Sequence, residues 1–361
     1  MARMQQKKYT DPITNNTVNH LTEPNAMNSE FYQIFRDYKE ISIRYNEKSR
    51  AVWCYYKPTP RPCFSMTVLK EALQIQQAII KYFGSLAENE EPAIRYLVQA
   101  SQVPGVFNLG GDLDLFIKLI ADKDKDTLME YATSCIDICY LNAVSLHLPI
   151  TTISLVQGAA LGGGFESALA SNVLIAEENT EMGFPEIRFN LFPGMGAYSL
   201  LARISGIPTA EKMITSGEIY SAKELHDLGI INRLAEAGKG RETVEEFIRQ
   251  HSRSYNGMQA VQLARQRYHP VSYEELIDIT RIWVDAALKV KPSDLRMMER
   301  LVNAQTRRIS TEDRQKNTRN LLRTKQDRRF ILENITFPLA DWSGETIMFD
   351  RRKNSDRRLL H

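Results

Sequence analysis

Long apolar runs are missing from this sequence, and so is an apolar segment near its amino terminus. A membrane-spanning helix needs roughly 20 predominantly apolar residues in succession, so we expect no membrane span. The first residues, MARMQQKKYTDPITNN, lack the apolar core of a signal peptide. A cytoplasmic protein is therefore predicted.

Cysteine and histidine are scarce. The four cysteines, Cys54, Cys63, Cys135 and Cys139, match no common zinc-site spacing, and the six histidines form no spaced cluster. We therefore predict no metal and no cofactor. Cys135 and Cys139 would lie one turn apart on a helix, which is typical of small residues buried in a core.

An excess of charge of one sign is also absent. The 46 Lys and Arg residues nearly balance 44 Asp and Glu residues, for a net charge of +2. This balance does not favour a nucleic-acid-binding protein.

A Gly-x-Ser-x-Gly nucleophile elbow in its proper context is missing as well. The remaining candidates for chemistry are carboxyl groups and the backbone.

The spacing of apolar residues predicts strands and helices in alternation. The chain has 361 residues, of which 43% are hydrophobic, enough for a large core. Alternating residues predict a hairpin over 41–45 and 52–56, and helical spacing predicts a helix over 66–83 that Gly84 ends. Further predicted elements are strands at 94–98, 150–156 and 173–176, helices at 127–146 and from Gly162 to about 170, and an almost entirely helical part from about 222 to 308. This alternation is typical of an α/β fold with parallel strands.

Residues 157–166, QGAALGGGFE, combine the end of a predicted strand, three glycines and the start of a helix. Adjacent glycines are costly in regular structure, and their use is close approach of the backbone to a ligand. Free N–H groups at a helix N-terminus would point at negative charge. A phosphate cradle uses similar geometry, but its Gly-Lys-Ser/Thr ending and the Gly-x-Gly-x-x-Gly spacing are absent here.

A second glycine turn lies upstream at residues 109–112, LGGD. One backbone N–H from each turn would form a two-donor oxyanion hole. Removal of a proton beside a thioester carbonyl places negative charge on the carbonyl oxygen. Preorganised donors aimed at that oxygen are worth roughly 3–4 kcal/mol each.

Two glutamates accompany these turns. Glu166 follows the triple glycine, and Glu186 ends the sequence MGFPE at 182–186. Neighbouring carboxyl groups do not both ionise easily, so such a pair supplies one acid and one base near neutral pH. Either glutamate alone is typical of a surface residue or a helix cap. The two together with both glycine turns favour a catalytic pair.

Four motifs occur in order: GGDL at 110–113, ALGGGFE at 160–166, MGFPE at 182–186 and FPGMGA at 192–197. Together they resemble the crotonase, or enoyl-CoA hydratase/isomerase, superfamily, over residues of about 40 to 308. The resemblance implies an α/β crotonase fold, a spiral of ββα units that forms two roughly perpendicular sheets with a helical carboxyl-terminal region. It also implies a homotrimer or a hexamer.

The same resemblance assigns roles to individual residues. It implies that Gly111 and Gly163 form the oxyanion hole and that Glu166 and Glu186 are catalytic. In hydratases of this family such a pair adds or removes water across the 2,3 bond of an acyl thioester. The residues alone do not assign which glutamate is the acid and which the base.

A narrower resemblance is carried by residues 119–137, 162–169 and 176–206. These stretches look most like the diffusible signal factor synthases, bacterial quorum-sensing enzymes. Such enzymes dehydrate 3-hydroxyacyl-acyl carrier protein to the cis-2-enoyl form and hydrolyse the thioester, which implies a lyase with thioesterase activity. The alternative is a metabolic enoyl-CoA hydratase or isomerase that acts on coenzyme A thioesters. A catalytically silent member is disfavoured because both glutamates are present.

A long acyl chain needs an apolar tunnel. Leu161 and Met195 flank the two turns that carry the glutamates, and Trp283 and Leu301 lie in the predicted carboxyl-terminal helices. We interpret these four residues as substrate-binding. Ordinary core packing is an equal alternative for each of them.

Four segments are predicted: a flexible arm over 1–30, the crotonase spiral over 31–235, a helical region over 236–310 and a basic extension over 311–361. From residue 306 onward, fourteen Lys and Arg residues stand against eight Asp and Glu residues. This composition predicts a solvated extension or a docking segment for an acidic partner. A sensor kinase restrains the resembling synthases, so its receiver domain is a predicted partner.

Overall fold

The computed structural model describes residues 28–57, 59, 61–303, 339–340 and 346–347. Its larger sheet has six strands in the order β1-β2-β3-β5-β7-β10. Their bounds are β1 (Ile41–Asn46), β2 (Ala51–Tyr56), β3 (Tyr96–Ser101), β5 (Thr151–Val156), β7 (Val173–Glu177) and β10 (Arg233–Ala235). β1 and β2 form the predicted antiparallel hairpin, and every later neighbour in the sheet is parallel.

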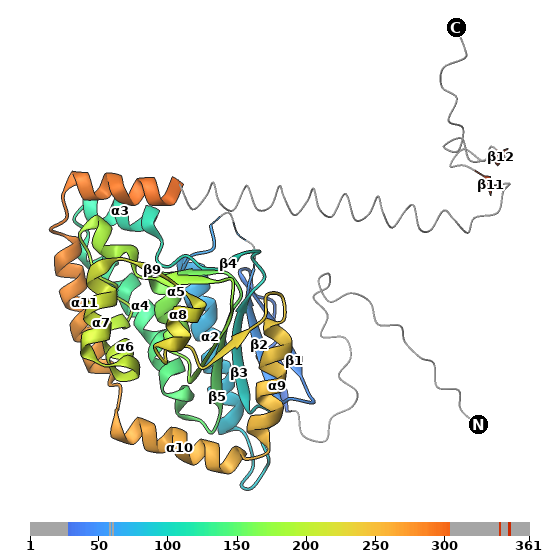
Figure 1. The fold of residues 1–361 in the computed structure, drawn as a ribbon. Coiled ribbons are helices and arrows are strands. Elements are labelled where there is room, and N and C mark those ends of the chain that lie inside the picture. The colour runs from blue at the N-terminus through green and yellow to red at the C-terminus, as the bar shows by residue number, and fades with distance from the viewer. Residues whose placement is uncertain (1–27, 58, 60, 304–338, 341–345, 348–361) are drawn as a thin grey trace, which may run out of the picture. The chain divides into compact units, whose positions relative to one another are not determined.

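Both faces of this sheet are buried, because helices lie on each side (Figure 1). Along β3, Leu97 joins the main core under α2 (Met66–Gly84) and α4 (Lys125–Ala143). The alternate residues Tyr96 and Val98 join a second core, which α9 (Gly240–Ser252) covers with Val244 and Ile248. The alternation of strand residues therefore distributes apolar side chains to two cores.

A second sheet of four short strands has the order β4-β6-β8-β9. The strands are β4 (Val106–Asn108), β6 (Ala159–Leu161), β8 (Glu181–Gly183) and β9 (Ile219–Ser221). β4, β6 and β8 run parallel, whereas β9 is antiparallel to β8. Because three strands run parallel, their carboxyl ends lie at one edge, and each is followed there by a segment that carries candidate site residues.

The other helices surround these two sheets. They are α1 (Ser29–Gln33), α3 (Leu113–Ala121), α5 (Gly163–Leu169), α6 (Ala197–Ser205), α7 (Ile207–Ser216), α8 (Ala222–Asp227), α10 (Tyr255–Tyr268) and α11 (Tyr273–Ala287), with short 3₁₀ turns η1 (Ser145–His147) and η2 (Pro185–Phe189) and a helix over 292–303. The predicted α/β architecture is thus present, with two mixed sheets and carboxyl-terminal helices.

Several predicted boundaries were wrong. The strand expected at 94–98 begins two residues later, at Tyr96, and continues to Ser101. The helix expected to reach Leu146 ends at Ala143, because residues 145–147 adopt positive φ angles. The part expected to be almost entirely helical from about 222 contains β10, which pairs with β7 at the sheet edge.

The chain divides into two units, Met1–Ile309 and Ser310–His361. In the second unit, β11 (Leu339–Ala340) pairs antiparallel with β12 (Thr346–Ile347). The rest of the predicted basic extension, and residues 1–27 of the predicted arm, lie outside the described residues. The four predicted segment boundaries stay predictions.

Candidate active site

The two predicted glycine turns lie against each other at the carboxyl ends of β4 and β6. Gly110 has a φ of +92°, and a methyl group built on it would lie 2.8 Å from the Leu161 carbonyl oxygen and 3.0 Å from the Gly163 nitrogen. A side chain at Gly110 would therefore push the turns apart. The left-handed conformation also favours glycine at this position.

The upstream turn leaves one N–H group without a partner. Three of its four N–H groups donate to protein oxygens: Leu109 to Pro62 O (2.8 Å), Gly110 to Asn108 Oδ1 (2.8 Å) and Asp112 to Tyr131 Oη (3.1 Å). No acceptor is recorded for the Gly111 N–H within the described residues. Gly111 is partly exposed and lines a cavity, so its N–H is available to a bound acceptor.

Gly163 presents the second free donor. It is the first residue of α5, where the first N–H groups have no partner inside the helix, and the described part of the chain supplies none from outside. A methyl group built on Gly163 would lie 3.5 Å from the Gly111 nitrogen. The two free N–H groups are thus close enough to bind one oxygen atom.

Glu166 lies on the first turn of α5 and is 1% exposed. Its Oε1 accepts hydrogen bonds from the backbone N–H groups of Met195 (2.7 Å) and Ala197 (2.9 Å). Burial raises the pKa of Glu166 to about 7, and these two bonds act in the opposite direction because they stabilise the charged form.

Glu186 lies in η2, directly after β8, in a different environment. The residue is partly exposed, but its Oε2 is buried and has no hydrogen-bond partner in the described chain. Burial first, and the charge of Glu166 second, raise the pKa of Glu186 well above its usual range. The pair therefore favours a charged Glu166 and a protonated Glu186.

Glycine at position 162 makes room for this pair. Gly162 has a φ of +52°, and a methyl group there would lie 2.2 Å from Glu186 Oε1. The Gly162 N–H donates to the Gly183 carbonyl, which ties the triple-glycine turn to the end of β8. The same turn thus carries the Gly163 N–H group and leads into Glu166, and it lies against the side chain of Glu186.

The model of the Enoyl-CoA hydratase/isomerase family matches residues 74–269, more than half of the chain and the whole stretch that holds both turns and both glutamates. The chain belongs to the enoyl-CoA hydratase/isomerase family.

Two named hydratases are similar to this chain over part of their length. The chain is 31% identical over 208 residues to "Probable enoyl-CoA hydratase 2, mitochondrial" of Arabidopsis thaliana, across 57% of this chain and 64% of that protein. It is 30% identical over 150 residues to "Methylglutaconyl-CoA hydratase, mitochondrial" of Homo sapiens, across 42% of each chain. The match thus spans less than two thirds of either relative.

Solved structures of the family share the fold. An enoyl-CoA hydratase from Bacillus halodurans aligns with a TM-score of 0.61 at 20% identity, across 72% of this chain and 99% of that one. Pseudomonas aeruginosa DspI aligns with a TM-score of 0.56 at 22% identity, across 69% of this chain and 95% of that one. At these identities the likeness concerns the fold alone.

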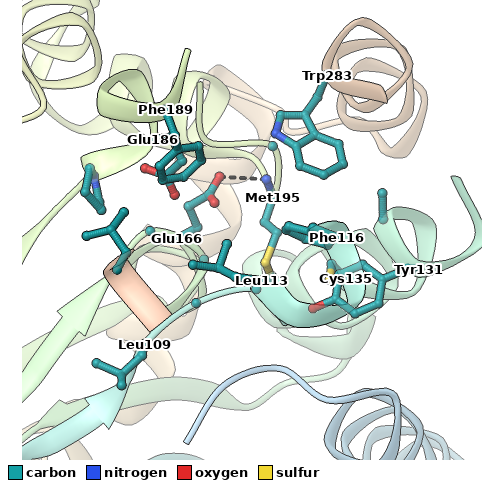
Figure 2. Close-up of a pocket in the computed structure, with 18 residues that line it drawn as sticks. Leu109, Leu113, Phe116, Tyr131, Cys135, Glu166, Glu186, Phe189, Met195 and Trp283 are labelled. Carbon is teal, nitrogen blue, oxygen red and sulfur yellow. Dashed lines mark hydrogen bonds between the residues drawn. The ribbon is translucent and has the colours of Figure 1, made fainter. Parts of the chain in front are cut away.

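Beside the glutamates, a cavity of about 60 Å³ opens between the turns and an aromatic wall. Figure 2 shows the two carboxyl groups on one side of Met195, and Phe116, Tyr131 and Cys135 on the other. The cavity is lined by both turns, both glutamates and these residues: Leu113, Phe116, Tyr131, Ala132, Cys135, Pro185, Phe189, Gly194, Met195, Trp283 and Leu301.

The structure brings together most, but not all, of the site residues predicted from the sequence. Gly111, Gly163 and both glutamates line the cavity, as do Met195, Trp283 and Leu301. Leu161 does not line it, because Leu161 packs against a small cluster of Val103, Val106 and Leu109. Its position beside the glycine turn in the sequence did not reveal which way it faces.

The aromatic wall was not predicted from the sequence. Phe116 and Tyr131 lie on α3 and α4, and each has the periodic spacing of an ordinary core residue. Phe116 could have been noticed because it follows the LGGD turn by one helical turn. Cys135 and Cys139 are buried one turn apart on α4, as predicted, and Cys135 also reaches the cavity.

None of the helices within the described residues has both the length and the apolar content that crossing a bilayer requires. In the same residues, no group of three or more His, Cys, Asp or Glu side chains is arranged to hold a metal ion.

Proposed function

We propose that this family member adds water to, or removes water from, the 2,3 bond of a fatty acyl thioester. In this proposal Gly111 and Gly163 form the oxyanion hole, and Glu166 and Glu186 are the catalytic pair. The observation that carries the proposal is the pair of buried carboxyl groups with unlike surroundings beside two free N–H groups. Acyl thioesters are also the substrates typical of crotonases.

Hydration begins with the thioester carbonyl oxygen at the two N–H groups, where negative charge develops as water attacks C3. Charged Glu166 accepts a proton from that water, and protonated Glu186 donates a proton to C2. The water oxygen is then bonded to C3, and exchange with solvent restores both carboxyl groups. Dehydration follows the same path in reverse, with Glu186 accepting the C2 proton.

The test measures the hydration of crotonyl-CoA and of longer 2-enoyl-CoA thioesters. The reaction is monitored through the loss of the enoyl-thioester absorbance. We expect Glu166→Gln and Glu186→Gln each to lower kcat by about 10²- to 10⁴-fold, because each removes a proton-transfer group but keeps the side-chain volume. Turnover by both variants at the wild-type rate would overturn the proposed roles.

A second candidate function is synthesis of a cis-2-unsaturated fatty acid signal from 3-hydroxyacyl-acyl carrier protein. It is favoured by the local sequence GGGFESAL at 162–169 and by the apolar, aromatic wall beside the glutamates. After dehydration, a carboxylate would activate water against the thioester carbonyl, releasing the carrier thiol and the free acid. The named hydratase relatives favour the first candidate.

Two incubations, one with a 3-hydroxyacyl-acyl carrier protein and one with crotonyl-CoA, separate the two candidates. The protein is supplied with 3-hydroxydodecanoyl-acyl carrier protein, and products are identified by mass spectrometry and NMR, with Glu166→Gln and Glu186→Gln in parallel. Free cis-2-dodecenoic acid that disappears in both variants would support the signal synthase. Rapid hydration of crotonyl-CoA without any free acid would support the metabolic hydratase.

Assembly into a trimer or hexamer and binding of a receiver domain remain proposals.

A further inference from the structure

Tyr131 links two segments beside the candidate oxyanion hole. Its ring is 2% exposed within the core of α4, and its hydroxyl donates to the Phe64 carbonyl oxygen at 2.5 Å. The same hydroxyl accepts a hydrogen bond from the Asp112 N–H at 3.1 Å. The single hydroxyl proton is therefore already committed to the protein, and Tyr131 is poorly placed to donate it to substrate.

The hydroxyl braces the place where these two segments meet. Phe64 and Gly111 form an isolated parallel bridge, and the Phe64 N–H donates to the Gly110 carbonyl at 2.8 Å. In a parallel ladder the Asp112 N–H faces the Phe64 carbonyl. The Tyr131 hydroxyl is hydrogen-bonded to both of these groups and so ties them together.

This pair of hydrogen bonds bears on the free N–H of Gly111. The peptide before Gly111 is held by the bond from Phe64 to the Gly110 carbonyl, and the peptide after it is held by Tyr131. Glycine has no side chain to restrict rotation, so the two flanking peptides determine where its N–H points. Removal of the hydroxyl leaves one of these two anchors free.

The surroundings of Asp112 and Tyr131 make the hydroxyl separable from the rest of the packing. The Asp112 carboxylate pairs with Arg61 and accepts from the Leu115 N–H at 3.3 Å, which caps α3. The Tyr131 ring packs edge-on against Phe116, with ring centres 5.0 Å apart. A Tyr131→Phe variant keeps the ring contact, the cap and the ion pair, and loses the bridge together with the contact between the hydroxyl and Cys135.

We propose that Tyr131 is a positioning residue, whose hydroxyl between Phe64 O and the Asp112 N–H sets the direction of the Gly111 N–H toward the substrate carbonyl oxygen. This inference rests on the proposed function, in which Gly111 donates to the thioester oxygen. Without the hydroxyl, the peptide after Gly111 loses this anchor, and the Gly111 N–H can turn away from the cavity.

The test compares Tyr131→Phe with Tyr82→Phe. Tyr82 is also fully buried, and its hydroxyl accepts from the Ala93 N–H at 2.7 Å, but Tyr82 is not among the residues that line the cavity. We expect Tyr131→Phe to lower kcat about 10- to 100-fold with KM changed less than about threefold, because a donor displaced by about 1 Å loses transition-state stabilisation. Tyr82→Phe should keep the wild-type kcat.

A spectroscopic measurement separates positioning from a general loss of packing. The carbonyl stretch of a bound, unreactive acyl thioester is recorded by isotope-edited infrared difference spectroscopy, since polarisation by the two donors lowers its frequency. We expect a smaller lowering in Tyr131→Phe than in wild type or Tyr82→Phe, and circular dichroism and thermal unfolding check that both variants fold.

The outcomes distinguish this inference from the proposed function. If Tyr131→Phe keeps the wild-type kcat and carbonyl frequency while Glu166→Gln and Glu186→Gln lose activity, the role of Tyr131 is wrong and the proposed function stands. If both tyrosine variants show an equal rise in the carbonyl frequency and an equal fall in kcat, the effect is general packing, and the role of Tyr131 is again wrong. If both glutamine variants turn over normally, the proposed function itself fails.

Discussion

Glu166 and Glu186 are the same residue type at one cavity, yet their hydrogen bonds differ. Glu166 Oε1 accepts from two backbone N–H groups, whereas Glu186 Oε2 is buried without a partner. Hydrogen bonds to the charged form favour it, and burial without them favours the neutral form. Backbone geometry thus gives two identical side chains opposite tasks in the proposed reaction.

At this scale we predict a pH dependence of hydration. The base must be charged to accept a proton, and the pKa of Glu166 is raised from its ordinary 4.5 to about 7, so kcat should fall as the pH drops through about 7. Burial raises the pKa of Glu186 well above its usual range, which favours its acid form. The measurement is kcat for crotonyl-CoA between about pH 5 and 10. A rate that stays constant down to pH 5 would contradict the assignment of Glu166 as the base.

At the scale of elements, three short parallel strands assemble the site. β4 ends at Asn108, β6 ends at Leu161 and β8 ends at Gly183, and the site segments begin directly after them. Each strand has only three residues, so none has enough alternation to be recognised from its own sequence. Their hydrogen bonds join positions roughly 20 to 50 residues apart, as between β4 and β6 and between β6 and β8.

The triple-glycine turn provides a prediction at this scale. In Gly162→Ala, the added methyl group would meet Glu186 Oε1 and the residue would keep a positive φ, so we expect a loss of about 1–3 kcal/mol in the free energy of unfolding. We also expect kcat to fall at least about tenfold, because Glu186 must move. Both are measured by chemical denaturation and steady-state kinetics.

Gly84→Ala is the matched control for this substitution. A methyl group on Gly84, the last residue of α2, would meet no atom within 4 Å. Its stability and kcat should therefore stay close to wild type. Equal losses in both variants would show that the close approach of Gly162 to Glu186 has no special importance.

At the scale of the whole described chain, the cavity wall combines helices that are far apart in sequence. Phe116 on α3 packs against Tyr131 on α4 and against Trp283 on α11, with ring centres 5.0 and 5.1 Å apart. Trp283 also covers Gly194, whose added methyl group would lie 2.6 Å from the indole ring. The fold thus places an apolar surface beside the carboxyl pair.

We predict that this wall discriminates between acyl chains. In Trp283→Leu, loss of contact with one or two methylene groups should lower kcat/KM for a 2-dodecenoyl thioester by about tenfold, at about 0.8 kcal/mol per methylene. The value for crotonyl-CoA, whose chain is too short to use the distant wall, should change less than about threefold. Equal losses for both substrates would mean that Trp283 only packs the core.

Local sequence predicted the elements whose signal lies within one segment. The 41–45 and 52–56 hairpin and the 66–83 helix carry their own alternation or periodicity, and the structure has β1, β2 and α2 there. The second sheet and β10 were missed as individual strands, because they depend on partners elsewhere in the chain. Phe116 and Tyr131 were missed for a related reason: a cavity wall and a packed core use the same apolar residues.

The chemical groups of the candidate site can be read from the amino-acid order alone: two glutamates, two glycine turns and their succession along the chain. The closeness of the Gly111 and Gly163 N–H groups, the packing of Leu161 away from the cavity, and the unlike surroundings that raise the pKa values of Glu166 and Glu186 depend on the tertiary structure. The reason is physical. A residue's identity sets which bonds it can form, but burial and the positions of distant backbone groups determine which of those bonds exist.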